Sequence, residues 1–208
     1  MAQGVSLEKW LDLVFDHSPS EPDWYLKQLP AACEALPLAL GLEYLTHIYS
    51  APIALFERYT EEQVGIGLWY LASPGICRWG DILTMRRDLP PASRLALIDS
   101  TLALYRDGFA PRCSPILAHL DAGGSRLNAI CYMFWDLIAL PWQEPRLMDR
   151  IGAVLAQILG LDHLSCQEAA IHGLGHLVQQ RCGDHRPLLR AYRARPRVDS
   201  RLRAYAHQ

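Results

Sequence analysis

The sequence predicts an all-α protein. Apolar residues recur at intervals of three and four along most of the chain, which is typical of helices with one buried face. No segment combines strict alternation with β-branched residues, so no strand is predicted. Two segments begin with a capping signature, Thr60 with Gln63 and Ser165 with Glu168, in which each side chain satisfies a free backbone N–H of a helix start.

The expected helices are separated by prolines, glycines and short polar turns. We predict long helices over residues 6–17, 31–50, 61–72, 77–88, 92–107, 126–140, 145–159 and 165–180. Shorter helices are expected after the caps Ser20 and Asp23, from Ser114, and as two segments within 184–206 that divide at Pro196. Residues 31–50 are almost entirely apolar and are therefore expected at the centre of the fold.

The helix of residues 165–180 has a distinctive pattern of small and aliphatic residues. It carries Ala169, Ala170, Leu174, Gly175 and Leu177 in that order. This pattern resembles the second helix of a HEAT-like repeat. The resemblance implies a right-handed α-solenoid of antiparallel helix pairs, whose second helices line a concave, partner-binding face with His172 and His176 at solvent-facing positions.

A weak internal period agrees with such a stack. Mid-helix leucines at Leu68, Leu102, Leu137 and Leu174 are 34, 35 and 37 residues apart. A second alignment, of Asn128, Tyr132 and Asp136 with Glu168, His172 and His176, gives an offset of 40. The alternative architecture is an irregular helical bundle. In either case we expect a single domain, with N-terminal helices in 1–59, repeat-like pairs in 60–181 and arginine-rich helices in 184–208.

Composition indicates a cytoplasmic protein with no membrane partner. Half of the 208 residues are hydrophobic, enough for one sizeable core. The amino terminus lacks the basic-then-apolar layout of a signal peptide, and no apolar run approaches the ~20 residues of a membrane helix. The six cysteines include no C-x-x-C pair and are expected to be reduced, buried thiols.

Charge is unevenly distributed along the chain. Residues 181–208 contain eight arginines against Asp184 and Asp199, a surplus of +6, so residues 1–180 carry −8. An acidic body disfavours nonspecific nucleic-acid binding, because phosphate contacts need a cationic face. The arginine cluster is the one part expected to contact RNA, unless its side chains pair with the acidic body.

Two histidines, His172 and His176, lie one helical turn apart and can point at one ion. Glu168 lies one turn earlier, and nearby Cys166, Cys182 or His185 would complete a zinc site. The general base of the His-Glu-x-x-His zinc proteases is missing. We therefore interpret the histidines as structural or partner-facing, and predict no metal, no cofactor and no catalytic residue.

Asp136 interrupts an otherwise apolar helical run, so its carboxylate needs a partner. If helices 126–140 and 164–180 are neighbours, Asp136 faces His172 or His176. Such a pair would either fix an imidazole tautomer for acid–base chemistry or form a structural hydrogen bond. The structural role is the commoner one in helical cores.

Three classes of function follow from these features. The first is a non-enzymatic protein-binding module, for example a bacterial immunity protein that neutralises a toxin. Its partner-binding residues are expected to be Tyr70, Tyr132, Asp136, Glu168, His172 and His176. The second is a His/Asp-based enzyme, with or without a metal. The third is an RNA-associated adaptor that works through the C-terminal arginines.

Overall fold

The computed structural model describes residues 5–27, 31–85, 88–121 and 123–207, and this part of the chain is helical without any strand. The all-α prediction is therefore confirmed. The longer helices are α1 (Leu7–Phe15), α4 (Leu38–Ser50), α6 (Glu61–Ala72), α7 (Pro91–Ala103), α8 (Arg126–Leu137), α9 (Pro145–Ile158), α10 (Leu164–Gln179) and α11 (Arg186–Arg193). The shorter ones are α2 (Trp24–Lys27), α3 (Ala31–Glu34), α5 (Ile53–Arg58) and α12 (Ser200–Tyr205).

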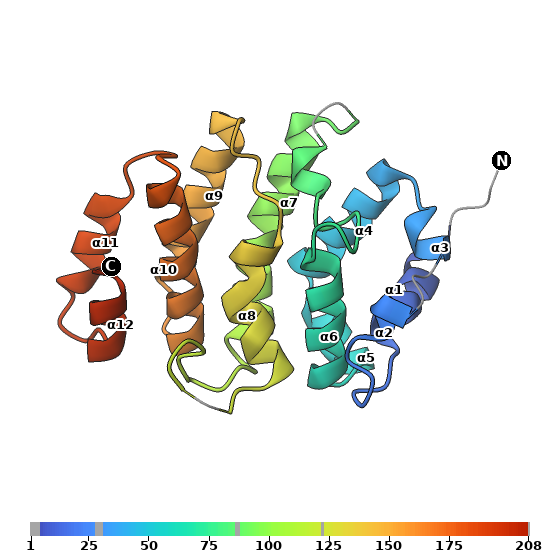
Figure 1. Cartoon of the computed structure of the whole chain (residues 1–208), viewed down its shortest axis with the longest axis horizontal. Coiled ribbons are helices and arrows are strands. Elements are labelled where there is room, and N and C mark those ends of the chain that lie inside the picture. The colour runs from blue at the N-terminus through green and yellow to red at the C-terminus, as the bar shows by residue number, and fades with distance from the viewer. Residues whose placement is uncertain (1–4, 28–30, 86–87, 122, 208) are drawn as a thin grey trace.

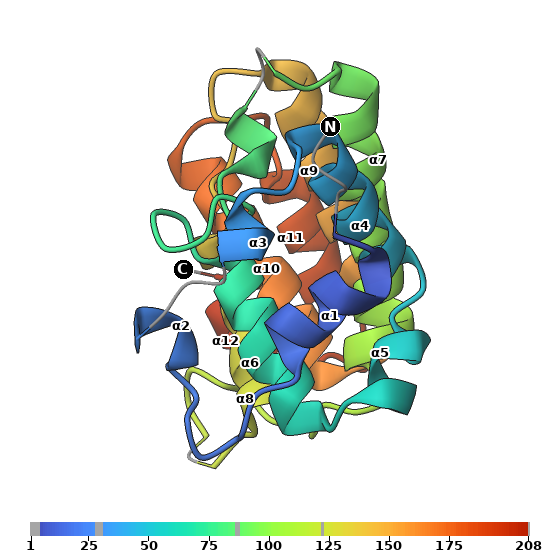
Figure 2. The ribbon, with the colours of Figure 1, turned by 90° about the vertical axis from the view of Figure 1, so that its right-hand side faces the viewer.

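The helices form two layers (Figure 1). In one layer α6 packs on α8, α8 on α10, and α10 on α12, and we call it the inner layer. In the other, the outer layer, α4, α7 and α9 pack side by side. Figure 2 shows both layers end-on, with α1 packed against α6. The N-terminal helices lie at one end of the molecule and α11 and α12 at the other. Among the described residues, no helix combines the length and apolar character needed to cross a bilayer.

The capping box at α6 is confirmed. The Thr60 side chain accepts a hydrogen bond from the Gln63 backbone N–H, and the Gln63 side chain accepts one from the Thr60 N–H. Both partners lie within one turn of each other, so the motif needs no contact from elsewhere in the fold. Ser6 caps α1 in a similar way by accepting from the Lys9 N–H.

The single helix expected over residues 31–50 is wrong. It is divided into α3 and α4 at Pro37, which stands at the N-cap of α4. Proline removes the backbone N–H of a helix interior and excludes the preceding residue from helical geometry. Of the helix expected from Ser20, the described residues contain the single turn of α2, and Ser20 and Asp23 both precede it, while residues 28–30 lie outside the described part of the chain.

The helix expected over 77–88 is also wrong, and residues 86–87 of this range lie outside the described residues. Residues 77–85 form turns and one 3₁₀ segment, Ile82–Thr84. The Gly80 carbonyl accepts a hydrogen bond from the Ala139 N–H at 2.8 Å, a tertiary bond that an uninterrupted helix would not allow. A Cβ on Gly80 would lie 2.6 Å from the Ser73 carbonyl carbon, so close backbone packing fixes this connection.

The helix expected over residues 92–107 continues past Gly108. α7 continues through a π-helical segment, Leu104–Phe109, in which the Ala110 N–H donates to the Tyr105 carbonyl. No helix begins at Ser114, because residues 114–121 form turns that pack on α10. The terminal pair α11 and α12, divided around Pro196, agrees with the prediction.

The period of 34–37 residues does not follow one layer. Leu102 lies on α7 of the outer layer, whereas Leu68 and Leu174 lie on α6 and α10 of the inner layer. The offset of 40 does align neighbouring inner helices, since it places Tyr132 of α8 beside His172 of α10.

A buried ion pair joins α7 to the start of α9. The Arg94 side chain is 1% exposed and donates two hydrogen bonds to the Glu144 carboxylate, at 2.7 and 2.8 Å. It also donates to the Leu83 carbonyl at 2.9 Å. The pair therefore connects α7, α9 and the 3₁₀ segment at one point.

Replacing Arg94 is expected to destabilise the fold. Arg94→Met should lower the free energy of unfolding by about 3 kcal/mol, because Glu144 and the Leu83 carbonyl lose a buried donor. Arg150→Met is the matched control, since Arg150 pairs with Asp99 at the surface and should cost less than about 1 kcal/mol. Urea denaturation measures both, and equal losses would contradict this account.

Candidate functional site

Asp136, His172 and His176 lie together on the surface of the inner layer. The helices α8 and α10 pack side by side, which places Asp136 opposite the two histidines as predicted. His172 Nε2 lies 2.6 Å from Asp136 Oδ2, and His176 Nε2 lies 2.5 Å from Asp136 Oδ1. The side chains are 25%, 20% and 29% exposed for Asp136, His172 and His176, so solvent reaches all three.

The two histidine contacts differ in kind. His172 Nε2 makes a hydrogen bond with the carboxylate. His176 Nε2 approaches the carboxylate without hydrogen-bond geometry, and this nitrogen is buried and has no hydrogen-bond partner. The site therefore contains one imidazole nitrogen that contacts the carboxylate without forming a hydrogen bond.

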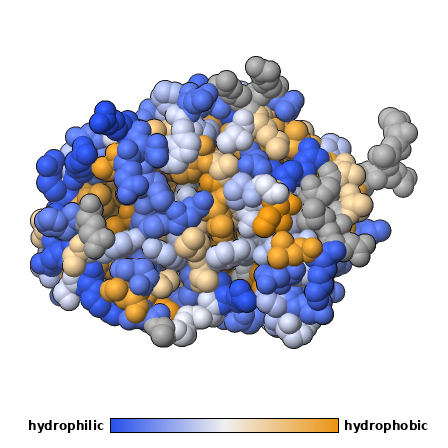
Figure 3. Space-filling view, in the orientation of Figure 1, coloured by the Kyte–Doolittle hydropathy of each residue, from blue (hydrophilic) through white to orange (hydrophobic). Residues whose placement is uncertain are grey.

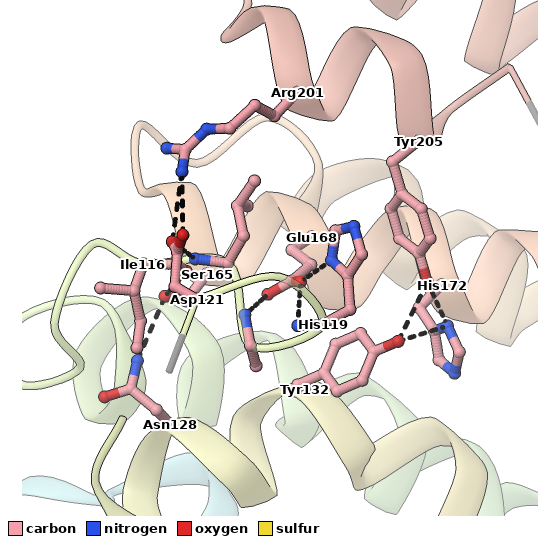
Figure 4. A network of polar contacts seen from close by, with 12 residues as sticks. Ile116, His119, Asp121, Asn128, Tyr132, Ser165, Glu168, His172, Arg201 and Tyr205 are labelled. Atoms are coloured by element: carbon pink, nitrogen blue, oxygen red, sulfur yellow. Dashed lines mark hydrogen bonds and ion pairs between the residues drawn. The ribbon is translucent and has the colours of Figure 1, made fainter. Parts of the chain in front are cut away.

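Two tyrosines hold the other side of His172 (Figure 4). The Tyr205 hydroxyl of α12 lies 2.6 Å from His172 Nδ1, and the Tyr132 hydroxyl lies 3.3 Å from it. The two hydroxyl oxygens are 3.1 Å apart. The site thus combines side chains from three neighbouring inner helices.

Tyr205, His172 and Asp136 follow each other in the order of a hydroxyl–imidazole–carboxylate triad. Burial raises the pKa of Tyr205 well above its usual value, and the hydrogen bond with Tyr132 and the charges of Glu168 and Asp136 add to this shift. A raised pKa keeps the hydroxyl protonated at neutral pH. The arrangement therefore works against a tyrosinate nucleophile and favours Tyr205 as a neutral hydrogen-bonding group.

Glu168 has a structural role. Its carboxylate is 0% exposed and accepts hydrogen bonds from the backbone N–H groups of Ala118 (2.8 Å) and His119 (3.1 Å). It also contacts Nδ1 of the His119 ring, which stacks on Tyr205 (Figure 4). Glu168 was expected to contact a partner, but its side chain has no exposed surface and does not belong to the partly exposed part of the site.

The capping box expected at Ser165 does not form. The N-cap is His163, two residues before Ser165, and the Ser165 hydroxyl donates to the carbonyls of Ser114 and Ile116, each at 2.8 Å. Asn128 holds the same connection from α8 by donating to the Ser114 carbonyl at 2.9 Å. Tertiary partners have therefore replaced the local ones.

Tyr70 does not belong to the exposed site. Its side chain is 0% exposed, and its ring packs against Trp24 and Tyr25 with centroids 5.0 and 5.4 Å apart. Of the six expected partner-binding residues, the structure brings together Tyr132, Asp136, His172 and His176 as partly exposed side chains. Tyr70 is excluded by its burial in the core.

Tyr205 and His119 join the site without having been predicted. Tyr205 reaches His172 across 33 residues of sequence, and His119 reaches Glu168 across 49. Neither shows a local motif. The sequence shows only that Tyr205 is an aromatic residue among the arginines of the last helix, and this does not identify the residue that it contacts.

The other residues considered for a zinc site point elsewhere. His185 Nε2 contacts the Cys182 carbonyl at 2.9 Å. All six cysteines are free thiols and five of them are buried as expected, whereas Cys182 is half-buried. Cys166 is 0% exposed. A hydrogen bond with Cys131 lowers the pKa of Cys166 to about 6, burial opposes this shift and His163 adds to it. No reagent reaches this thiol from the surface, so we assign it no chemistry.

The arginine-rich end forms a separate feature. Arg201 pairs with Asp121 of the body at 3.2 Å, as expected for a tail that packs on an acidic protein (Figure 4). Arg186, Arg190 and Arg193, with His207, instead line a hollow of about 250 Å³ between α11 and the C-terminus. Arg193 Nε is buried there without a hydrogen-bond partner. This end is mostly hydrophilic on the face of Figure 3.

Removing the Glu168 carboxylate is expected to free the 114–121 connection. Glu168→Ala should lower the free energy of unfolding by roughly 3 kcal/mol, because two backbone N–H groups lose their acceptor. Hydrogen exchange at Ala118 and His119 should accelerate. His119→Ala is the control, since it keeps both N–H bonds and should cost less. Unchanged protection of these amides in Glu168→Ala would refute the assignment.

No protein-family model matches this chain, and no curated protein or solved structure shows significant similarity to it. The functional argument therefore depends on the geometry of the site.

Proposed function

We propose that this chain is a non-enzymatic protein-binding module that contacts its partner through one strip of inner-layer side chains. This polar strip consists of Tyr132, Asp136, His172, His176 and Tyr205. The observation that carries the proposal is that these side chains contact one another across three neighbouring helices and remain partly exposed.

Preorganisation is the physical reason for choosing this surface. Side chains that are already fixed by mutual hydrogen bonds lose little conformational entropy when a partner binds. Tyrosine adds a large and rigid contact area with a polar tip, and it is enriched at binding hot spots.

The architecture proposed with this function is a HEAT-like right-handed α-solenoid, in which the strip lies on the second helices. Its support is the two-layer packing and the 40-residue offset that aligns Tyr132 and Asp136 with His172 and His176. An irregular two-layer bundle is the alternative, and it would leave the binding strip unchanged.

A cytoplasmic immunity protein that neutralises a basic bacterial toxin is one concrete form of this module. Residues 1–77 contain ten acidic residues against Lys9, Lys27 and Arg58, a balance of −7. This charge lies on the N-terminal helices, at the far end from α12 (Figure 1). A basic toxin would therefore extend from the strip toward α6 and α1.

The test is capture of a partner from an extract of the source organism, followed by mapping of its contact surface. Wild type should capture one protein in stoichiometric amount, and Asp136→Arg should reduce its affinity at least tenfold by placing a bulky cation in the strip. Asp149→Arg is the matched control, because Asp149 is exposed on α9 of the outer layer. Circular dichroism checks that all three are folded.

Equal loss of capture in both variants would contradict a contact surface at the strip. Capture of no stoichiometric protein by the wild type would contradict the binding module itself.

Nucleic-acid binding by the C-terminal arginines is a second candidate, favoured by the hollow that Arg186, Arg190 and Arg193 line. A group of arginines around one concavity suits phosphate, because guanidinium groups bind it with paired hydrogen bonds. The excess of +6 in residues 181–208 adds a long-range attraction for a polyanion.

Salt dependence tests this candidate. For single-stranded RNA, Arg186→Gln/Arg190→Gln should make the slope of log K against log[salt] shallower by about 1.4, since each lost phosphate contact removes about 0.7. Arg146→Gln/Arg150→Gln on α9 provides the control with the same change in net charge. Equal slopes for the two double variants would exclude the hollow as the RNA site.

A further inference from the structure

We infer that Asp136, His172 and His176 form a binding site for a divalent transition-metal ion of the zinc class. One donor atom from each residue lies within 4.8 Å of the other two. The two histidines are one turn apart on α10, and Asp136 faces them from α8. This inference is independent of the proposed protein partner.

The contact between His176 Nε2 and Asp136 is the strongest observation for a cation site. Nε2 is buried, has no hydrogen-bond partner and lies 2.5 Å from Asp136 Oδ1. Two atoms that both present lone pairs repel each other at this distance, so a proton must separate them, and a metal ion can take the place of that proton. A proton or a metal ion satisfies both atoms.

The surroundings of His172 prepare it as a metal ligand. A ligating histidine ordinarily donates its other ring N–H to an outer-shell acceptor, which fixes the tautomer. The Tyr205 hydroxyl, 2.6 Å from Nδ1, provides such an acceptor. When a metal ion binds, the proton stays on Nδ1, and Nε2, which now makes a hydrogen bond with Asp136, offers its lone pair to the ion.

The donor set selects the class of metal. Two imidazole nitrogens and one carboxylate oxygen suit Zn²⁺ and the neighbouring divalent ions Fe²⁺, Co²⁺, Ni²⁺ and Cu²⁺. Ca²⁺ and Mg²⁺ prefer sites built entirely from oxygen. Three protein ligands leave at least one coordination position for water or another ligand, and the partial exposure of all three side chains allows access to it.

Metal binding requires a small displacement of the carboxylate. Two ligands of a tetrahedral zinc ion are about 3.3 Å apart, given bond lengths of about 2.0–2.1 Å. The present separations of 2.5 and 2.6 Å fit a shared proton. The Asp136 carboxylate must therefore move away from the two imidazole nitrogens by about 0.8 Å. Its position at the surface permits this movement.

Calorimetric titration of the chelator-treated full chain with Zn²⁺ tests the site. Wild type should bind one ion per chain. His176→Ala and Asp136→Asn should each weaken binding more than 100-fold, and Tyr205→Phe by about tenfold, as outer-shell ligand partners do. His47→Ala is the control, because His47 is exposed on α4 of the outer layer and should leave affinity unchanged.

Cobalt spectroscopy separates this site from the thiols. Co²⁺ bound by nitrogen and oxygen gives visible ligand-field bands without the thiolate charge-transfer band that cysteine ligands produce. Circular dichroism checks folding, and His176→Gln replaces the alanine variant if that variant does not fold. Absence of saturable zinc binding, full affinity in the His176 and Asp136 variants, or a thiolate band would each overturn the inference.

The result can be read separately from that of partner capture. Zinc binding is measured on the isolated chain, whereas capture is measured with chelator present. If zinc does not bind but Asp136→Arg still abolishes capture, only the metal site fails. If zinc binds and no partner is captured, only the binding module fails.

Discussion

A carboxylate with no exposed surface needs donors from within the protein, and Glu168 obtains them from the connection between α7 and α8. Ser165 and Asn128 bind the same connection through the Ser114 carbonyl. The start of α8 is thereby fixed relative to α10. This registration sets which residues of the two helices meet further along, including Tyr132 and Asp136 opposite His172.

Close packing around Gly173 keeps α10 in contact with α8 of its own layer and with α9 of the outer layer. A Cβ at this position would lie 2.9 Å from Leu155 of α9 and 3.1 Å from Trp135 of α8, so a larger side chain would push the helices apart. Glycine costs roughly 1 kcal/mol of helix propensity relative to alanine. The missing side chain of Gly173 allows α8 and α10 to approach closely, and the contacts of His172 and His176 with Asp136 depend on this short distance.

Sequence reasoning succeeded where the interacting groups are local. Periodicity located most helices, and the Thr60 capping box formed between partners three residues apart. The same motif at Ser165 failed, because Ser165 and Glu168 find partners about 50 residues away. The pairing of Asp136 with the histidines was predictable, because a carboxylate in an otherwise apolar helical segment needs a partner. Tyr205 was not, since nothing local indicates that α12 folds back onto α10.

The segregation of charge along the helical layers changes what the net charge of −2 means. Inner-layer helices pack roughly 10 Å apart, so α6 and α12 are separated by about 30 Å, whereas the Debye length at physiological salt is about 8 Å. Each end is therefore screened from the other and acts as a separate pole. An approaching molecule meets either the acidic N-terminal helices or the basic C-terminal ones, and the isoelectric point near 6.4 describes neither surface.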